Sequence, residues 1–135
     1  MNIHIGVGLD DMKFGMSEEN IVNKYGKPDK TYLTDDKNTR YVYNELLLEL
    51  SFEKENNNLL GWIEVYNSDA LLNGQQLIGL KREKVLSFLS TFINEEPEID
   101  DYGSFLSITY NEIWLELQFS FDRLRNINFG SLDDE

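Results

Sequence analysis

Apolar and polar residues alternate in two stretches of the chain that are near-copies of each other. YNELLLELSF occupies residues 43–52 and YNEIWLELQF occupies residues 110–119, with seven of the ten positions identical. Alternation with a period of two is typical of a β-strand that buries one face. Two strands that merely shared this alternation would not also share their individual residues. The pattern therefore indicates that one structural unit is written twice.

A helical pattern precedes each copy. KFGMSEENIVNKYGKP and LIGLKREKVLSFLSTF align with Gly15 on Gly79, an offset of 64 residues, whereas the decapeptides are offset by 67. Ser17 is a favourable N-cap, and Gly26 is a favourable left-handed end for a short first helix. In the second segment, apolar residues spaced at i, i+1, i+3, i+4 and i+7 form one stripe. These residues are Val85, Leu86, Phe88, Leu89 and Phe92.

Each half therefore has the pattern of a helix followed by an antiparallel meander. A chain of 135 residues is short enough for one domain. The predicted fold class is α+β, with residues 1–135 forming a single domain of two repeats, about 9–67 and 73–130. Together the repeats are predicted to form one antiparallel sheet with the helices on one face.

The strand register follows from the expected turns. A two-residue turn at 44–45 pairs Tyr43 with Leu46, and the second copy is predicted to turn in the same way. For the last hairpin we expect a three-residue loop at 122–124, because a two-residue loop would place Leu117 opposite a polar residue. In this register the leucine-rich face of the sheet packs on the helices.

The opposite face of the sheet combines aromatic and acidic residues. Ordinary solvated faces favour small polar and charged residues, whereas tryptophan and tyrosine anchor interfaces. This face is therefore the candidate partner-binding surface, unless a loop, the N-terminal segment or a dimer partner covers it. Its predicted binding residues are Leu47, Glu49, Trp62, Glu64, Tyr66, Trp114 and Glu116.

The charge of the chain restricts the class of partner. Its 25 acidic and 12 basic residues give a net charge of −13 and a pI near 4.4. Nucleic acids and anionic membranes both require a cationic surface, so neither is an expected partner. A basic protein is the natural complement.

The inventory of reactive groups is poor, and we expect no enzyme, no metal and no cofactor. Cysteine is absent and His4 is the only histidine, which leaves no catalytic triad and no histidine-rich zinc site. The four Asp-Asp pairs lack the spacing of a calcium loop. Glu49, Glu64 and Glu116 could serve a carboxylate-pair hydrolase by number, but an open sheet face offers no concave pocket.

The location predicted from the sequence is the cytoplasm. The opening residues MNIHIGVGLDD lack the cationic start and apolar run of a signal peptide. No later stretch approaches the ~20 apolar residues of a membrane span.

The segment FGMSEENIVNKYGKP resembles the helix opening of small bacterial modules of the β-lactamase-inhibitory-protein and outer-membrane-assembly lipoprotein type. In those modules Gly-Met-Ser/Thr-x-x-x-Val-x-x-x-x-Gly-x-Pro precedes an antiparallel meander, and the inhibitory protein binds another protein through the sheet face of two tandem units. The residues that match are Gly15, Met16, Ser17, Ile21 or Val22, Gly26 and Pro28, and the second half keeps Gly79, Leu80 and Val85. The resemblance implies a protein-binding sheet. It does not extend to that inhibitor's disulfides, target or location.

A small, acidic, cysteine-free chain also resembles the immunity proteins that bacteria pair with toxins. The leading hypothesis is therefore a non-catalytic inhibitor, a cytoplasmic immunity protein that neutralises a cognate cationic, nuclease-like toxin. One alternative is a small-molecule or peptide-binding module with a cleft between the two repeats. A second alternative is a self-associating scaffold with both tryptophans at the contact.

Overall fold

The computed structural model describes residues 1–132. Within this range it contains two helices, α1 (Glu18–Tyr25) and α2 (Arg82–Leu89), and two short 3-10 segments, η1 (Lys54–Asn56) and η2 (Asn111–Ile113). Neither helix is long and apolar enough to cross a membrane. The remaining elements are strands, which form two sheets.

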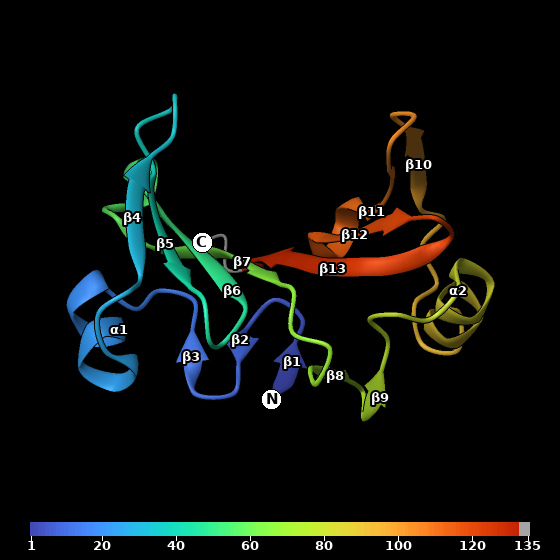
Figure 1. The fold of residues 1–135 in the computed structure, drawn as a ribbon, viewed down its shortest axis with the longest axis horizontal. Coiled ribbons are helices and arrows are strands. Elements are labelled where there is room, and N and C mark those ends of the chain that lie inside the picture. The colour runs from blue at the N-terminus through green and yellow to red at the C-terminus, as the bar shows by residue number, and fades with distance from the viewer. Residues whose placement is uncertain (133–135) are drawn as a thin grey trace.

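The larger sheet has eight strands in the order β10-β11-β12-β13-β7-β6-β5-β4, all antiparallel (Figure 1). Its first-half strands are β4 (Lys30–Leu33), β5 (Thr39–Tyr43), β6 (Leu48–Glu53) and β7 (Leu59–Val65). Its second-half strands are β10 (Glu98–Asp101), β11 (Leu106–Tyr110), β12 (Leu115–Ser120) and β13 (Arg123–Gly130). The halves meet where β7 pairs with β13.

The smaller sheet joins the N-terminal segment to the linker between the halves. Its order is β3-β2-β1-β8-β9, and β1 pairs with β8 in parallel. The strands are β1 (Asn2–His4), β2 (Gly8–Leu9), β3 (Met12–Lys13), β8 (Leu71–Leu72) and β9 (Gln75–Gln76). Helices and largely antiparallel strands were predicted, but the prediction of one sheet is wrong. These strands of two or three residues are too short to produce a recognisable alternation.

One core joins these parts. The buried cluster takes Ile3 from the small sheet, Ile21 from α1, Val85 from α2 and the leucine-rich face of the large sheet. Figure 1 shows both helices and the small sheet below the large sheet, whose end strands β4 and β10 rise on the other side. The described side of the sheet that faces away from this core is called the outer face below.

The first helix begins at the predicted N-cap and ends at Gly26, which has a positive φ but, at ψ 179°, not the predicted left-handed helical conformation. The backbone N–H of Asn20 donates to Ser17 Oγ at 3.1 Å, and the Asn20 side chain accepts from the Ser17 N–H at 3.2 Å, which closes a capping box. Gly26, at φ 84°, donates its N–H to Val22. α2 has no side-chain cap at Lys81, so core packing of Val85 and Leu89 holds it in place. Phe92, predicted as part of the same stripe, lies beyond the end of α2 and is exposed.

The predicted tight turns of the two repeated hairpins are wrong. Tyr43 pairs with Leu48 rather than Leu46, and Tyr110 pairs with Leu115. Each loop has four residues, 44–47 and 111–114, and its last residue adopts the left-handed conformation. The error is two residues, so the alternation of faces is unchanged and the leucine-rich face is buried as expected.

The last hairpin also differs from the prediction. Phe121 and Asp122, both at positive φ, form a two-residue turn, instead of the three-residue loop. A β-bulge after Gln118 then shifts the register by one, so Leu117 pairs with Ile127. The bulge, rather than a three-residue loop, therefore places Leu117 opposite an apolar residue. The β6–β7 hairpin has a register shift at the corresponding place, between Ser51 and Phe52.

Candidate functional site

Three of the predicted acidic residues lie in one row across the middle of the outer face. Glu49 of β6 pairs with Glu64 of β7, Glu64 pairs with Asn128 of β13, and Asn128 pairs with Glu116 of β12. Cross-strand partners on one face have neighbouring side chains. The structure therefore brings together the acidic residues that the sequence analysis placed on this face.

Arg40 pairs with two of these carboxylates. Its guanidinium Nη1 lies 2.7 Å from Glu49 Oε2 and 3.2 Å from Glu64 Oε2. Burial alone would lower the pKa of Arg40, but attraction to Glu64 and Glu49 outweighs it and raises that pKa above its ordinary value. The two glutamate side chains are only 17% and 18% exposed, so they hold the sheet together more than they project charge into solvent.

Neutral donors surround the third carboxylate. Glu116 accepts hydrogen bonds from Ser107 Oγ at 2.8 Å, from Asn128 Nδ2 at 3.2 Å and from Gln118 Nε2 at 3.4 Å. Among the described ion pairs none involves Glu116. Asn126 continues the network by donating to Asn128 Oδ1 at 2.9 Å. Glu116 therefore keeps an uncompensated charge inside a satisfied polar cluster.

Trp62 and Tyr66 lie on either side of this row, two residues before and two residues after Glu64 in sequence, and both contact that carboxylate. The indole Nε1 of Trp62 donates to Glu64 Oε2 at 3.2 Å, and the Tyr66 hydroxyl donates to Glu64 Oε1 at 2.9 Å. Burial and the nearby Glu64 raise the pKa of Tyr66 above its ordinary value, so its hydroxyl stays protonated as a donor. Both aromatic residues are oriented by hydrogen bonds.

Leu47 and Trp114 occupy the loops rather than the strands on which they were predicted. Each is the last residue of a four-residue hairpin loop, at φ 55° and φ 51°. The Leu47 carbonyl accepts from Tyr66 N–H at 2.9 Å, and the Trp114 carbonyl accepts from Gly130 N–H at 3.0 Å. Their side chains are 48% and 55% exposed. The loops therefore project these side chains at the rim of the outer face.

Five of the seven predicted residues form two groups, each of which lines one hollow. A small hollow of about 130 Å³ is lined by Leu47, Tyr66 and Glu49. A larger one of about 300 Å³ is lined by Trp62 and Trp114. Glu64 joins the groups through its bonds to both Trp62 and Tyr66. Glu116 belongs to neither lining.

Several residues of the face were missed from the sequence. The Tyr32 hydroxyl donates to Glu49, but β4 was not predicted because all four of its residues are exposed and no burial pattern marks it. Glu53 and Gly130 line the larger hollow. Gly130 could have been found from the repeat, since it lies 64 residues after Tyr66.

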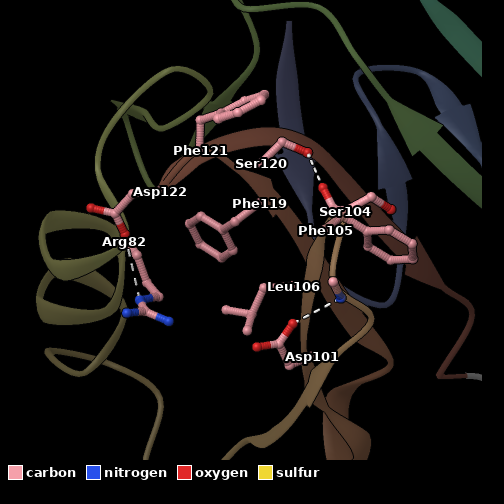
Figure 2. Close-up of a pocket in the computed structure, with 10 residues that line it drawn as sticks. Arg82, Asp101, Ser104, Phe105, Leu106, Phe119, Ser120, Phe121 and Asp122 are labelled. Carbon is pink, nitrogen blue, oxygen red and sulfur yellow. Dashed lines mark hydrogen bonds and ion pairs between the residues drawn. The ribbon is translucent and has the colours of Figure 1, made fainter.

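A third hollow, of about 240 Å³, lies within the second half of the chain (Figure 2). Arg82 and Asp122 form an ion pair of 3.6 Å at one side of it, and Asp101 accepts from the Gly103 N–H at 2.9 Å at the other. The ring of Phe119 points into the space between them, as Figure 2 shows. Its lining is of mixed charge and shares no residue with the predicted face.

Metal chemistry finds no support in residues 1–132. Within this range no group of three or more histidine or acidic side chains is arranged to hold an ion. The Asp-Asp pair at 133–134 lies outside the described residues.

Comparisons with known proteins identify a fold. No protein-family model and no curated protein matches the chain. An extracellular protein containing a SCP domain from Bacillus anthracis str. Ames has 14% sequence identity and a TM-score of 0.55 over 87% of this chain. A DUF4309 family protein, YjgB, from Bacillus subtilis subsp. subtilis str. 168 has 15% identity and a TM-score of 0.53 over 93% of this chain and 82% of its own. This chain spans 44% of the first. At these identities the likeness establishes a shared fold and leaves function to the site.

Proposed function

We propose that this protein is a non-catalytic binding protein whose outer face docks a basic partner. The observation that carries the proposal is that both tryptophans of the chain, Trp62 and Trp114, line one open hollow, and that Trp114 is 55% exposed. Tryptophan is among the side chains that most often carry binding energy at interfaces.

The charge of the chain selects the partner. A net charge of −13 repels anions and attracts a cationic protein over distances of about 8 Å, the screening length at physiological salt. Cationic nucleases hold a polyanionic substrate, so an acidic inhibitor both reaches them rapidly and competes for the same surface. We therefore infer a cytoplasmic immunity protein that neutralises a nuclease-like bacterial toxin.

The architecture proposed for this role is a tandem duplication with both helices on one face of the sheet. Its support is the matched detail of the halves, which each contribute one helix, four successive antiparallel strands and one β-bulge. The extra residues at the bulges are Gly61 and Arg125, which are 64 positions apart. The offset equals that of the aligned helices. Two units side by side would double the width of the docking face.

Catalysis is not proposed because the polar groups of the face are engaged with one another. A general acid or base must reach a substrate proton, whereas Glu49 and Glu64 are held by Arg40 and are largely covered. The wider hollow contains Trp62, Trp114 and two acidic side chains on an open surface. Such a surface suits recognition.

The test uses the protein encoded by the neighbouring reading frame. We expect it to be basic, to stop bacterial growth when expressed alone, and to be neutralised when this chain is co-expressed. Replacing Trp114 by alanine should weaken the purified complex at least tenfold in calorimetry, since hot-spot truncation costs about 2 kcal/mol or more. A neighbour that does not bind the wild-type chain would contradict this pairing.

The control for this substitution is Phe121→Ala. Phe121 is also an exposed aromatic residue at positive φ in a hairpin turn, and it is 92% exposed, but it lies outside the tryptophan hollow. Its removal should leave both growth protection and affinity unchanged. Circular dichroism of both variants should match that of the parent; unfolding of Trp114→Ala would contradict its assignment as a surface anchor.

A second candidate function is a small-molecule or peptide-binding module with its site between the halves. The tryptophan hollow supports this alternative because both halves line it. Gly61 and Trp62 come from the first half, and Trp114 and Gly130 come from the second. Thermal-shift screening against a metabolite collection separates the two functions. A stabilising small ligand, together with no bound protein partner, would select this alternative.

A further inference from the structure

The tryptophan hollow is a built feature rather than a gap between loops. It has a volume of about 300 Å³ and receives residues from β6, η1, β7, the 111–114 loop and β13. Its principal lining residues are Glu53, Glu55, Gly61, Trp62, Trp114 and Gly130. The following inference rests on the proposed function and specifies what the partner places there.

Two glycines leave room for the larger side chains beside them. A Cβ atom at Gly130 would lie 2.7 Å from Cε3 of Trp62, so the indole rests directly on the backbone of β13. A Cβ atom at Gly61 would lie 2.7 Å from Cγ of Glu53, so this acidic side chain rests on the bulge of β7. Neither contact could form around an alanine without displacing the neighbouring side chain.

The side chains of the hollow are held before any partner arrives. The Trp62 Nε1–H donates to Glu64 Oε2 at 3.2 Å. The Glu53 carboxylate accepts from Ser51 Oγ at 2.7 Å, and Ser51 is itself buried. Fixing these rotamers in the free protein reduces the entropy lost on binding.

The chemistry of the hollow selects a cation. Its aromatic lining presents tryptophan, the strongest partner for cation–π attraction, and its charged lining consists of Glu53 and Glu55. Within residues 1–132, no lysine or arginine lines it. Lys54, which lies between the two acidic residues in sequence, is exposed and outside the lining.

We propose that this hollow receives an arginine side chain of the basic partner. The guanidinium group stacks on an indole and pairs with Glu53 and Glu55. Arginine fits better than lysine because its guanidinium is planar and more weakly hydrated, so it loses less on leaving water for an aromatic surface. A shallow, open hollow also suits a flat group that retains contact with solvent at its edge.

The chain provides its own probe for this site. It has two tryptophans and both line the hollow, so the two indole N–H signals in a nitrogen-15 NMR spectrum report on this place. The Trp62 signal also reports on Glu64, to which its indole donates, so a shift of both signals together marks the hollow. The probe ligand is an acetylated and amidated tetra-arginine peptide, added to the full-length protein. Its matched control is the same peptide with citrulline, which keeps the planar shape and removes the charge.

We expect saturable shifts of both indole signals with the arginine peptide and at least tenfold weaker binding of the citrulline peptide. Equal shifts with citrulline would overturn the cation assignment. Equal affinity for a tetralysine peptide would overturn the choice of arginine. Binding of the arginine peptide that leaves both indole signals unmoved would place it elsewhere on the acidic surface and overturn the site.

Variants separate the hollow from the general acidity of the protein. The double substitution Glu53→Gln and Glu55→Gln should lower the affinity for the arginine peptide at least tenfold. Glu83→Gln, a neutralised exposed residue of α2, should weaken it less than twofold. Gly130→Ala provides a second route, because it displaces the Trp62 indole without changing any charge. Equal effects of the Glu53/Glu55 and Glu83 variants would show that the peptide binds by non-specific charge attraction, and would overturn the proposal.

The outcomes for the hollow and for the proposed function are distinguishable. If a purified basic partner binds the parent and Trp114→Ala equally while the arginine peptide does not bind, the hollow is wrong and the inhibitor function stands. If the peptide binds with the expected variant pattern and no protein partner binds, the inhibitor function is wrong and the cation site stands.

Discussion

Arg40 is the residue on which the polar row of the outer face depends. It bridges Glu49 and Glu64, which are directly opposite each other on β6 and β7. Two carboxylates in that relation repel, and neither is exposed enough for water to screen the repulsion fully. Glu49 and Glu64 are predicted partner-binding residues, and in the structure both also pair with Arg40.

Replacing Arg40 by methionine should destabilise the protein. The change removes the shared cation and leaves two covered carboxylates adjacent, so we expect a loss of about 2–4 kcal/mol, near the range for breaking a buried ion pair. Urea denaturation monitored by circular dichroism measures it. Adding Glu49→Gln to the variant should restore part of the lost stability. If the double variant is instead less stable than Arg40→Met by the full cost of Glu49→Gln alone, repulsion between the carboxylates is not the cause.

At the level of elements, the hairpin loops combine exposed side chains with strained backbone. Leu47 and Trp114 are the last residues of equivalent four-residue loops. Both adopt the left-handed backbone conformation, which residues other than glycine rarely adopt. A strained position that carries a large exposed apolar side chain is typical of a functional site. The loops appear on the rim of the face that the proposal assigns to the partner.

Comparing glycine with alanine at position 114 isolates this strain, because both substitutions remove the indole. Trp114→Gly should be more stable than Trp114→Ala by about 1 kcal/mol, the cost of a left-handed L-residue. Urea denaturation of both variants gives the difference. At Glu112, which lies in the 3-10 segment of the same loop and has no positive φ, glycine should be the less stable of the two. If the glycine variant is the more stable of the two at both positions, the strain argument is contradicted.

The sequence was informative about faces and poor at register. Alternation predicted correctly that Leu48, Leu50, Leu115 and Leu117 are buried, because burial of one face imposes a period of two. The loop lengths could not be predicted, since a left-handed leucine or tryptophan has no sequence signature comparable to Asn-Gly. The end strands β4 and β10 were missed because every residue in them is exposed.

The candidate site was partly predictable for the same reason. The alternation of side chains along each strand was enough to predict four residues on the outer face, namely Glu49, Trp62, Glu64 and Glu116. The structure brings the three acidic residues into one row. The bond between Arg40 and two of them depends on distances between strands of the first half, and the contact of Gly130 with Trp62 depends on the distance between strands of different halves. Periodicity within a strand carries no information about such distances.

At the scale of the whole molecule, the two halves share one seam and one core. Phe129 of β13 lies opposite Ile63 of β7 and Leu115 of β12, is fully buried, and packs edge-on against Phe14 at 5.5 Å between ring centroids. Phe14 precedes α1, so this ring joins the end of the chain's second half to the beginning of its first. The halves should therefore unfold as one cooperative unit.

Phe129→Ala should lower the free energy of unfolding by about 3–5 kcal/mol, the usual cost of truncating a buried phenylalanine. Hydrogen exchange should become faster in β5 and β11 together, although these strands lie in different halves. The exposed Phe121→Ala variant serves as the control and should change neither quantity. Faster exchange confined to the second half would contradict a single cooperative unit.

The seam has a consequence for the origin of the chain. Glu64 and Asn128 face each other across it and occupy corresponding places in the proposed repeats. A single-unit forebear that associated with its own copy through this strand would have set identical side chains against each other there, two glutamates in the case of the first unit. Under the proposed duplication, joining both copies in one polypeptide frees the two places to differ. Asn128, whose amide donates to Glu116 at 3.2 Å, stands where a second carboxylate would repel Glu64. Glutamate at position 128 would create that conflict.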